Sequence, residues 1–102
     1  MRELPVACEL SPAALRARRE NLLRSLVSRS SERVELPSGY RLRFAAEAGV
    51  LQVIAAAVDA ERHCCRFLAF NVSVEPAEGP ITLDLVGPPG TREFLTALFD
   101  EP

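Results

Sequence analysis

Two of the three cysteines in this 102-residue chain are adjacent, Cys64 and Cys65, and the only histidine, His63, comes directly before them. Glu61 lies about one helical turn upstream, so a helix would carry its carboxyl group on the same side as Cys65. Adjacent thiolates beside a carboxylate favour a soft ion such as Hg(II), Cu(I), Cd(II) or As(III). We therefore expect this stretch to carry the chemistry of the chain, with Cys64, Cys65 and Glu61 as candidate ligands.

Cys8 is the remaining cysteine and the candidate third sulfur ligand, provided that its segment lies beside the other two. It alternates with Val6 and Leu10, so a place in the apolar interior is an equally good interpretation. Structural zinc is less favoured, because its ligands usually come as spaced pairs such as Cys-x2-Cys and no second pair exists here. Zinc held by the cysteines with His63 or Glu61 stays open.

Three other roles for the cysteine pair compete with metal binding. A disulfide between Cys64 and Cys65 would be strained, because adjacent Cα atoms lie about 3.8 Å apart, below the usual lower limit of about 4.4 Å. A thiol-redox or organometal-processing enzyme would need a low-pKa thiolate, which the C-terminal end of a helix and the nearby Glu61 both disfavour. We leave enzymatic activity open and favour a binding role. The third alternative is a small interaction module whose cysteines are structural.

The composition is that of an ordinary single globular domain, with 48% hydrophobic and 25% charged residues. A net charge of −2 without a basic patch argues against a nucleic-acid partner. The sequence shows no signal-like N-terminus and no apolar run long enough to span a bilayer, so we expect a cytoplasmic protein without a membrane partner. An odd number of cysteines agrees with thiols in a reducing compartment.

The elements before the motif are predicted from local patterns. Ser11 is expected to be the N-cap of a first helix, with Pro12 at its first position. The apolar stripe of this helix consists of Leu15, Leu22, Leu23, Leu26 and Val27. Residues 32–44 are predicted to form a β-hairpin, in which Pro37-Ser38-Gly39 supplies the turn with a glycine able to take a positive φ.

A second helix is predicted from about Ala46 to about His63, which places Glu61 on or beside its buried stripe. Residues 67–86 predict a second hairpin, and a last helix is expected with Thr91 as its N-cap. The order α-ββ-α-ββ-α predicts one α+β domain over residues 1–102: two layers, with a mainly antiparallel sheet of about four strands and helices on one face. Apolar residues left exposed would make a homodimer a candidate assembly.

The motif also resembles a family. The chain contains Glu61-Arg62-x-Cys64-Cys65-x-Phe67-Leu68-x-Phe70, then Gly79-Pro80 and Gly87-Pro88-x-Gly90. This pattern resembles a group of small, uncharacterised bacterial proteins with an E-R-x-C-C-P-F signature. Cys8-Glu9-Leu10 matches their upstream cysteine and Pro37-Ser38-Gly39-Tyr40 their hairpin, so the resemblance covers most of the chain. It implies an association with resistance to mercury or other metals and supplies no assigned activity. Arg66 replaces the usual proline, which puts a positive charge beside the thiols.

Overall fold

The computed structural model describes residues 22–100, and within that range the side chain of Cys64 is not described. The elements are a first helix whose described part covers residues 22–29, then β1 (Glu32–Leu36), β2 (Gly39–Phe44), α2 (Val50–Cys64), β3 (Ala69–Val74), β4 (Ile81–Val86) and α3 (Thr91–Asp100). The predicted N-terminal cap at Ser11, the helix positions Pro12 and Leu15, and the candidate ligand Cys8 lie outside the described residues.

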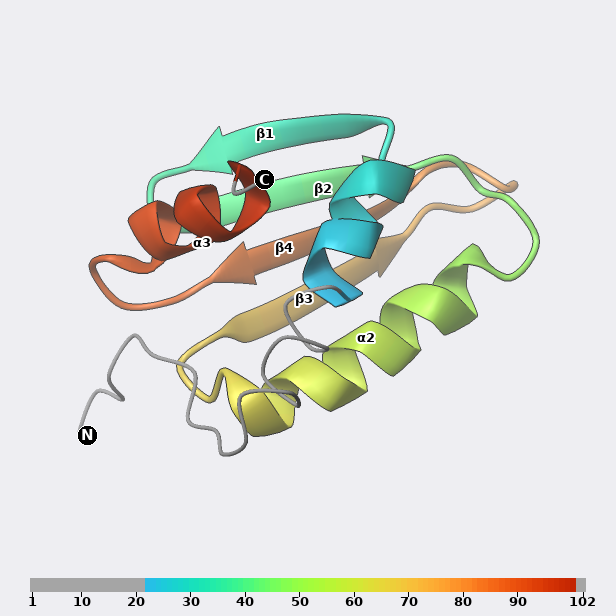
Figure 1. The fold of residues 1–102 in the computed structure, drawn as a ribbon. Helices are drawn as coiled ribbons and strands as arrows, with labels where there is room; N and C mark the ends of the chain where they lie inside the picture. Colours follow the sequence, from blue (N-terminus) through green and yellow to red (C-terminus); the bar gives the residue numbers. More distant parts are fainter. Residues whose placement is uncertain (1–21, 101–102) are drawn as a thin grey trace.

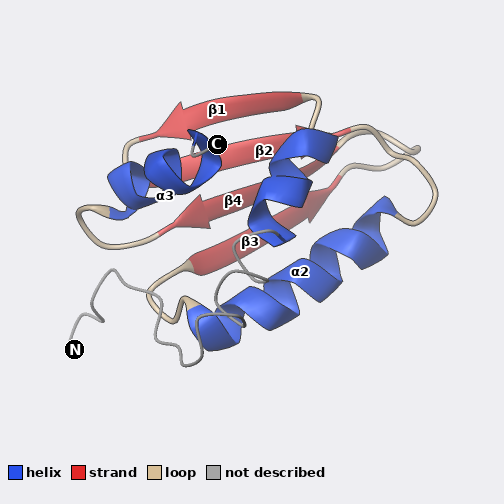
Figure 2. Cartoon of the chain, in the orientation of Figure 1, coloured by secondary structure: helices blue, strands red, loops and turns tan. Residues whose placement is uncertain are grey.

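The described strands form one antiparallel sheet in the order β1-β2-β4-β3. The three helices lie on one face of this sheet (Figures 1 and 2). The predicted two-layer α+β fold is therefore confirmed, together with the order α-ββ-α-ββ-α and both hairpins. The second helix begins at Val50 instead of about Ala46, because Gly49 takes a left-handed conformation (φ 85°) at its N-cap.

The core lies between the sheet and the helices. Alternate residues of the two central strands point into it, among them the fully buried Leu42, Leu83 and Leu85. The helices contribute further buried side chains: Leu23, Leu26, Val50, Ile54, Ala57, Leu95 and Leu98. The opposite face of the sheet carries charged side chains together with the exposed Val34. There Arg41 makes a two-point contact with Asp84 of the neighbouring strand, at 2.8 and 2.9 Å, and this carboxylate raises the pKa of Arg41 above its ordinary value.

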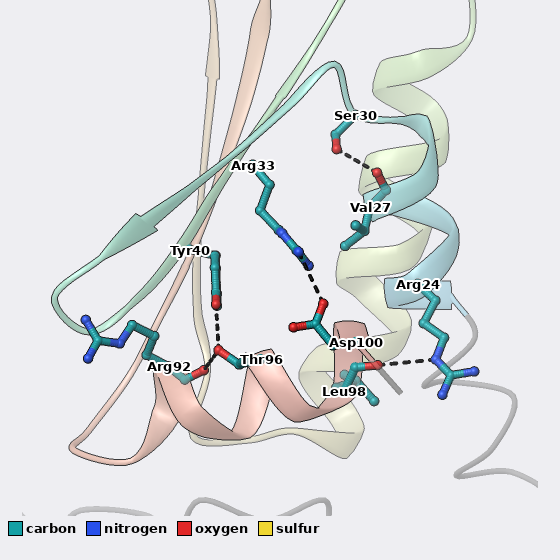
Figure 3. Close-up of polar contacts among 9 residues, drawn as sticks. All are labelled: Arg24, Val27, Ser30, Arg33, Tyr40, Arg92, Thr96, Leu98 and Asp100. Atoms are coloured by element: carbon teal, nitrogen blue, oxygen red, sulfur yellow. Dashed lines mark hydrogen bonds and ion pairs between the residues drawn. The ribbon is translucent and has the colours of Figure 1, made fainter. Parts of the chain in front are cut away.

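Hydrogen bonds fix α3 against the sheet (Figure 3). The hydroxyl of Thr96 donates to the carbonyl of Arg92 one turn earlier, at 2.8 Å. The hydroxyl of Tyr40 contacts the same Thr96 oxygen. Because the single Thr96 proton is already engaged, Tyr40 must be the donor. Central strand β2 is thereby joined to the middle of α3.

Two arginines tie other elements to α3 (Figure 3). Arg33 of β1 forms an ion pair with Asp100 at 3.2 Å, and its guanidinium lies 5.7 Å from the ring centroid of Tyr40 and 5.6 Å from that of Phe99. This arrangement is a cation–π contact with both rings. Arg24 of the first helix donates to the carbonyl of Leu98 at 3.3 Å. The C-terminal end of α3 is thus held from two sides.

Two sequence-based expectations about backbone roles are wrong. Gly39 does not take a positive φ; of the described glycines, Gly49 and Gly90 do. Gly39 instead permits a close approach between strands, because an added Cβ would lie 1.8 Å from the Leu85 carbonyl oxygen. Thr91 is the first residue of α3, and its hydroxyl donates to the Pro88 carbonyl at 2.6 Å instead of accepting from a helix N–H. The role of Gly39 depends on packing between two strands, which local patterns do not encode, whereas the Thr91 contact is local, with a residue three positions earlier.

The turn between β3 and β4 contains backbone strain. Ala77 and Glu78 both have positive φ, 57° and 58°, and the N–H of Gly79 donates to the Pro76 carbonyl at 3.1 Å. This is the geometry of a type I′ turn, which asparagine and glycine adopt without the penalty that other residues pay. We expect Ala77→Asn/Glu78→Gly to raise the free energy of unfolding by about 1 kcal/mol in urea denaturation.

The chain offers a control with the same pair of residue types. Ala46 and Glu47 lie in the loop before α2, where neither has a positive φ. Ala46→Asn/Glu47→Gly should therefore leave stability unchanged or lower it. An equal gain in both double variants would show that turn strain is not the cause.

Candidate functional site at the end of α2

The apolar face of α2 carries Glu61 into the interior. Val50, Ile54 and Ala57 are buried at helical spacing, and Glu61 continues the same stripe at its C-terminal end. The helix stops at the cap residue Cys65, whose N–H still donates to the Glu61 carbonyl at 2.7 Å. The predicted position of Glu61 on the buried stripe is confirmed.

Glu61 and Cys65 meet inside the protein. Their exposed fractions are 1% and 2%, and the Cys65 thiol donates to Glu61 Oε1 over a sulfur–oxygen distance of 3.6 Å. The second carboxyl oxygen, Oε2, is also shielded from solvent. Cys65 carries a thiol and is not part of a disulfide. A buried thiol therefore lies next to a buried carboxyl group, one helical turn apart.

The polar neighbours of the motif differ from this pair in their exposure. Arg62, His63 and Arg66 are exposed to solvent, so His63 lies on a different side of the helix end from Cys65, as expected for its position. Two arginines of β2 form ion pairs elsewhere. Arg41 pairs with Asp84, and Arg43 pairs with Glu32, both on the face of the sheet opposite the helices. Neither ion pair reaches the interior.

Of the four predicted ligands, the structure brings two together, Glu61 and Cys65. The backbone of Cys64 forms the last residue of α2, but the direction of its thiol and the position of Cys8 lie outside what is described. Among the described side chains there is no group of three or more histidine, cysteine, aspartate or glutamate residues that could hold a metal ion. A third ligand would have to come from side chains that are not described, which include those of Cys64 and Cys8.

The exit from α2 is held by contacts that the sequence did not predict. Phe67 packs edge-to-face against Phe94 of α3, with ring centroids 5.2 Å apart. Gly87 lies so close to this segment that an added Cβ would be 2.9 Å from the Phe67 carbonyl oxygen and 2.6 Å from Thr91 Oγ1. The Leu68 N–H donates to the Cys65 carbonyl at 3.0 Å. These contacts fix the backbone directly after the cysteines.

Comparisons with protein-family models, with curated proteins and with solved structures give no match to this chain. None of the helices in the described part of the chain is long and apolar enough to cross a membrane. The functional interpretation therefore depends on the chemistry of the buried thiol and carboxyl group at the end of α2.

Proposed function

We propose that the end of α2 binds a soft metal or metalloid ion, such as Hg(II), Cu(I), Cd(II) or As(III). Cys65 and Cys64 are the sulfur ligands, Glu61 is the adjacent carboxylate, and Cys8 is the candidate third sulfur. The observation that carries the proposal is the contact of 3.6 Å between the buried Cys65 thiol and the buried Glu61 carboxyl group. Such binding requires reduced thiols, so the protein would act in a reducing compartment such as the cytoplasm.

Electrostatics support a cation at this contact. Without a proton, the thiolate and the carboxylate would place two negative charges together in the interior, which is unfavourable. A bound cation takes the place of the thiol proton and neutralises both groups. Sulfur ligands select soft ions over the harder Mg²⁺ and Ca²⁺. The same arrangement disfavours a catalytic thiolate, because the helix end and Glu61 both oppose a bare negative sulfur.

A structural role for the cysteines is the competing account, and one observation favours it. Cys65 belongs to the main hydrophobic core, together with the neighbouring Phe67 and Leu68. A buried cysteine commonly packs as a small apolar side chain. The metal-binding account predicts high affinity for a soft ion, because several ligands hold it together. The structural account predicts no such affinity.

Absorption spectroscopy tests the proposal. Adding Cd(II) to the reduced protein should produce an ultraviolet band from sulfur-to-metal charge transfer that saturates at one ion per chain. Affinity should increase with pH, because thiols release their protons on binding. A chain that takes up no Cd(II), or gives no sulfur band, would support the structural account instead.

Glu61→Gln tests the carboxylate separately. Glutamine keeps the size of the side chain and an oxygen that accepts from the Cys65 thiol, but it carries no negative charge. We expect the affinity for Cd(II) to fall about tenfold, as for other groups that support metal ligands. Glu47→Gln, which removes the same charge from an exposed loop residue, is the control and should leave the affinity unchanged. Equal affinities in both variants would remove Glu61 from the site.

A further inference from the structure

The two edges of the sheet formed by the described residues differ in charge. Edge strand β1 has the sequence Glu32-Arg33-Val34-Glu35-Leu36, with three charged residues, and Pro37 follows it. Edge strand β3, Ala69–Val74, reads AFNVSV and has no charged residue and no proline. Charges and prolines are the usual devices that stop an edge strand from pairing with another chain. Within the strands themselves only β1 carries charges, whereas a proline follows each edge strand: Pro37 comes after β1, and Glu75 and Pro76 come after β3.

Strand β3 also exposes apolar side chains. Val72 and Val74 are 43% and 56% exposed, although they lie on the face of the sheet that the helices cover. Leu68 and Phe70 precede these valines at alternate positions along the same face. Leu68 is buried and Phe70 is partly buried, but the packing ends there. The second half of β3, residues 72–74, is therefore an uncharged strand edge with two exposed valines.

We propose that β3 is a dimerisation edge, which pairs antiparallel with β3 of a second copy of this chain and extends the sheet across a two-fold axis. A second copy is the occupant that the strand itself favours, because the neutral β3 pairs with itself without charge repulsion and its own side chains match across a two-fold axis. Strand addition of this kind supplies main-chain hydrogen bonds directly. The inference is independent of the proposed metal site.

The side chains of β3 select one register. Residues opposite each other in an antiparallel pair lie on the same face of the sheet. An axis through Val72 places Val72 against its own copy and Phe70 against Val74 on the helix-covered face. On the other face it places Asn71 against Ser73, where an amide and a hydroxyl form complementary hydrogen bonds. This register covers both exposed valines at once.

Sedimentation of the reduced full-length chain at increasing concentration tests the dimer. The mass should rise from 11.2 kDa toward twice that value. Val72→Lys puts two positive charges together at the axis and should raise the dimer dissociation constant at least about tenfold. Val34→Lys makes the same change at an exposed valine of β1 (38% exposed) and should leave the dissociation constant unchanged.

Oxidative crosslinking tests the register. A Val72→Cys variant should form an intermolecular disulfide through position 72, identified by peptide mapping so that the native cysteines are distinguished. Ser73→Cys, one residue along and on the opposite face, should crosslink far less.

The proposal is overturned if the chain stays at 11.2 kDa up to millimolar concentration. Protection of the β3 amides from hydrogen exchange in such a monomer would show that residues 1–21 of the same chain cover this edge instead, and it would also overturn the proposal. It is also overturned if the two lysine variants behave alike, or if position 73 crosslinks as readily as position 72.

Discussion

Replacing both Cys64 and Cys65 with serine is expected to abolish the binding of Hg(II) and Cd(II), with a loss of affinity of at least about a thousandfold. A serine hydroxyl stays protonated at neutral pH and is a poor ligand for soft ions, whereas a cysteine thiol gives up its proton to them. Serine still donates a hydrogen bond to Glu61, so the chain should remain folded. Competitive titration against a chelator of known affinity, with circular dichroism on the same samples, measures both properties.

Single cysteine variants show how much each sulfur contributes to the affinity for the metal ion. Cys65→Ser removes the sulfur that contacts Glu61 and should cause most of the loss. Cys8→Ser keeps the adjacent pair intact; a smaller decrease would place Cys8 in the coordination shell, and no decrease would leave a site of two sulfurs. Identical uptake by the wild-type chain and the Cys64→Ser/Cys65→Ser variant would contradict the metal-binding account.

The second large effect is expected at Gly39. The Cβ of an alanine there would lie 1.8 Å from the Leu85 carbonyl oxygen, 2.8 Å from its carbonyl carbon and 2.9 Å from the Val86 Cα. All three atoms belong to the backbone of β4, so no side-chain rotation relieves the overlap. The central strands β2 and β4 must move apart, and we expect Gly39→Ala to lower the free energy of unfolding by about 3 kcal/mol or more. That is a large part of the stability of a small domain.

Urea denaturation measures the loss. Ser38→Ala, at the exposed neighbouring position, is the control and should change stability by less than about 0.5 kcal/mol. If Gly39→Ala is as stable as this control, the β2 and β4 backbones do not lie as close together at Gly39 as the structure indicates.

Periodicity within the chain was sufficient to predict the architecture. Strand β4 alternates buried and partly exposed residues from Ile81 to Val86, as the sequence indicated. The contact between Glu61 and Cys65 followed from the same kind of reasoning, because residues four apart on a helix lie on one side. Periodicity did not hold at every position, since Leu22, which it placed on the apolar stripe of the first helix, is 36% exposed.

Features that depend on pairing between distant segments were not predictable. The role of Gly39 depends on the Leu85 carbonyl, which lies 46 positions later in the chain. The exposure of Val72 and Val74 depends on β3 being at the edge of the sheet, which alternation does not reveal. The Phe67–Phe94 contact requires the relative placement of helix α3 and the segment that follows α2. Each of these is a long-range packing relation without a local signal.

Native mass spectrometry in the presence of excess reduced glutathione tests the central claim most directly. Glutathione offers one thiol per molecule, so it removes Hg(II) from isolated cysteines but competes poorly with several ligands fixed in one site. We predict that the wild-type chain retains one Hg(II) per protomer under these conditions and that the Cys64→Ser/Cys65→Ser variant retains none. A wild-type chain found entirely in the metal-free form would contradict the account and assign Cys65 to the hydrophobic core alone.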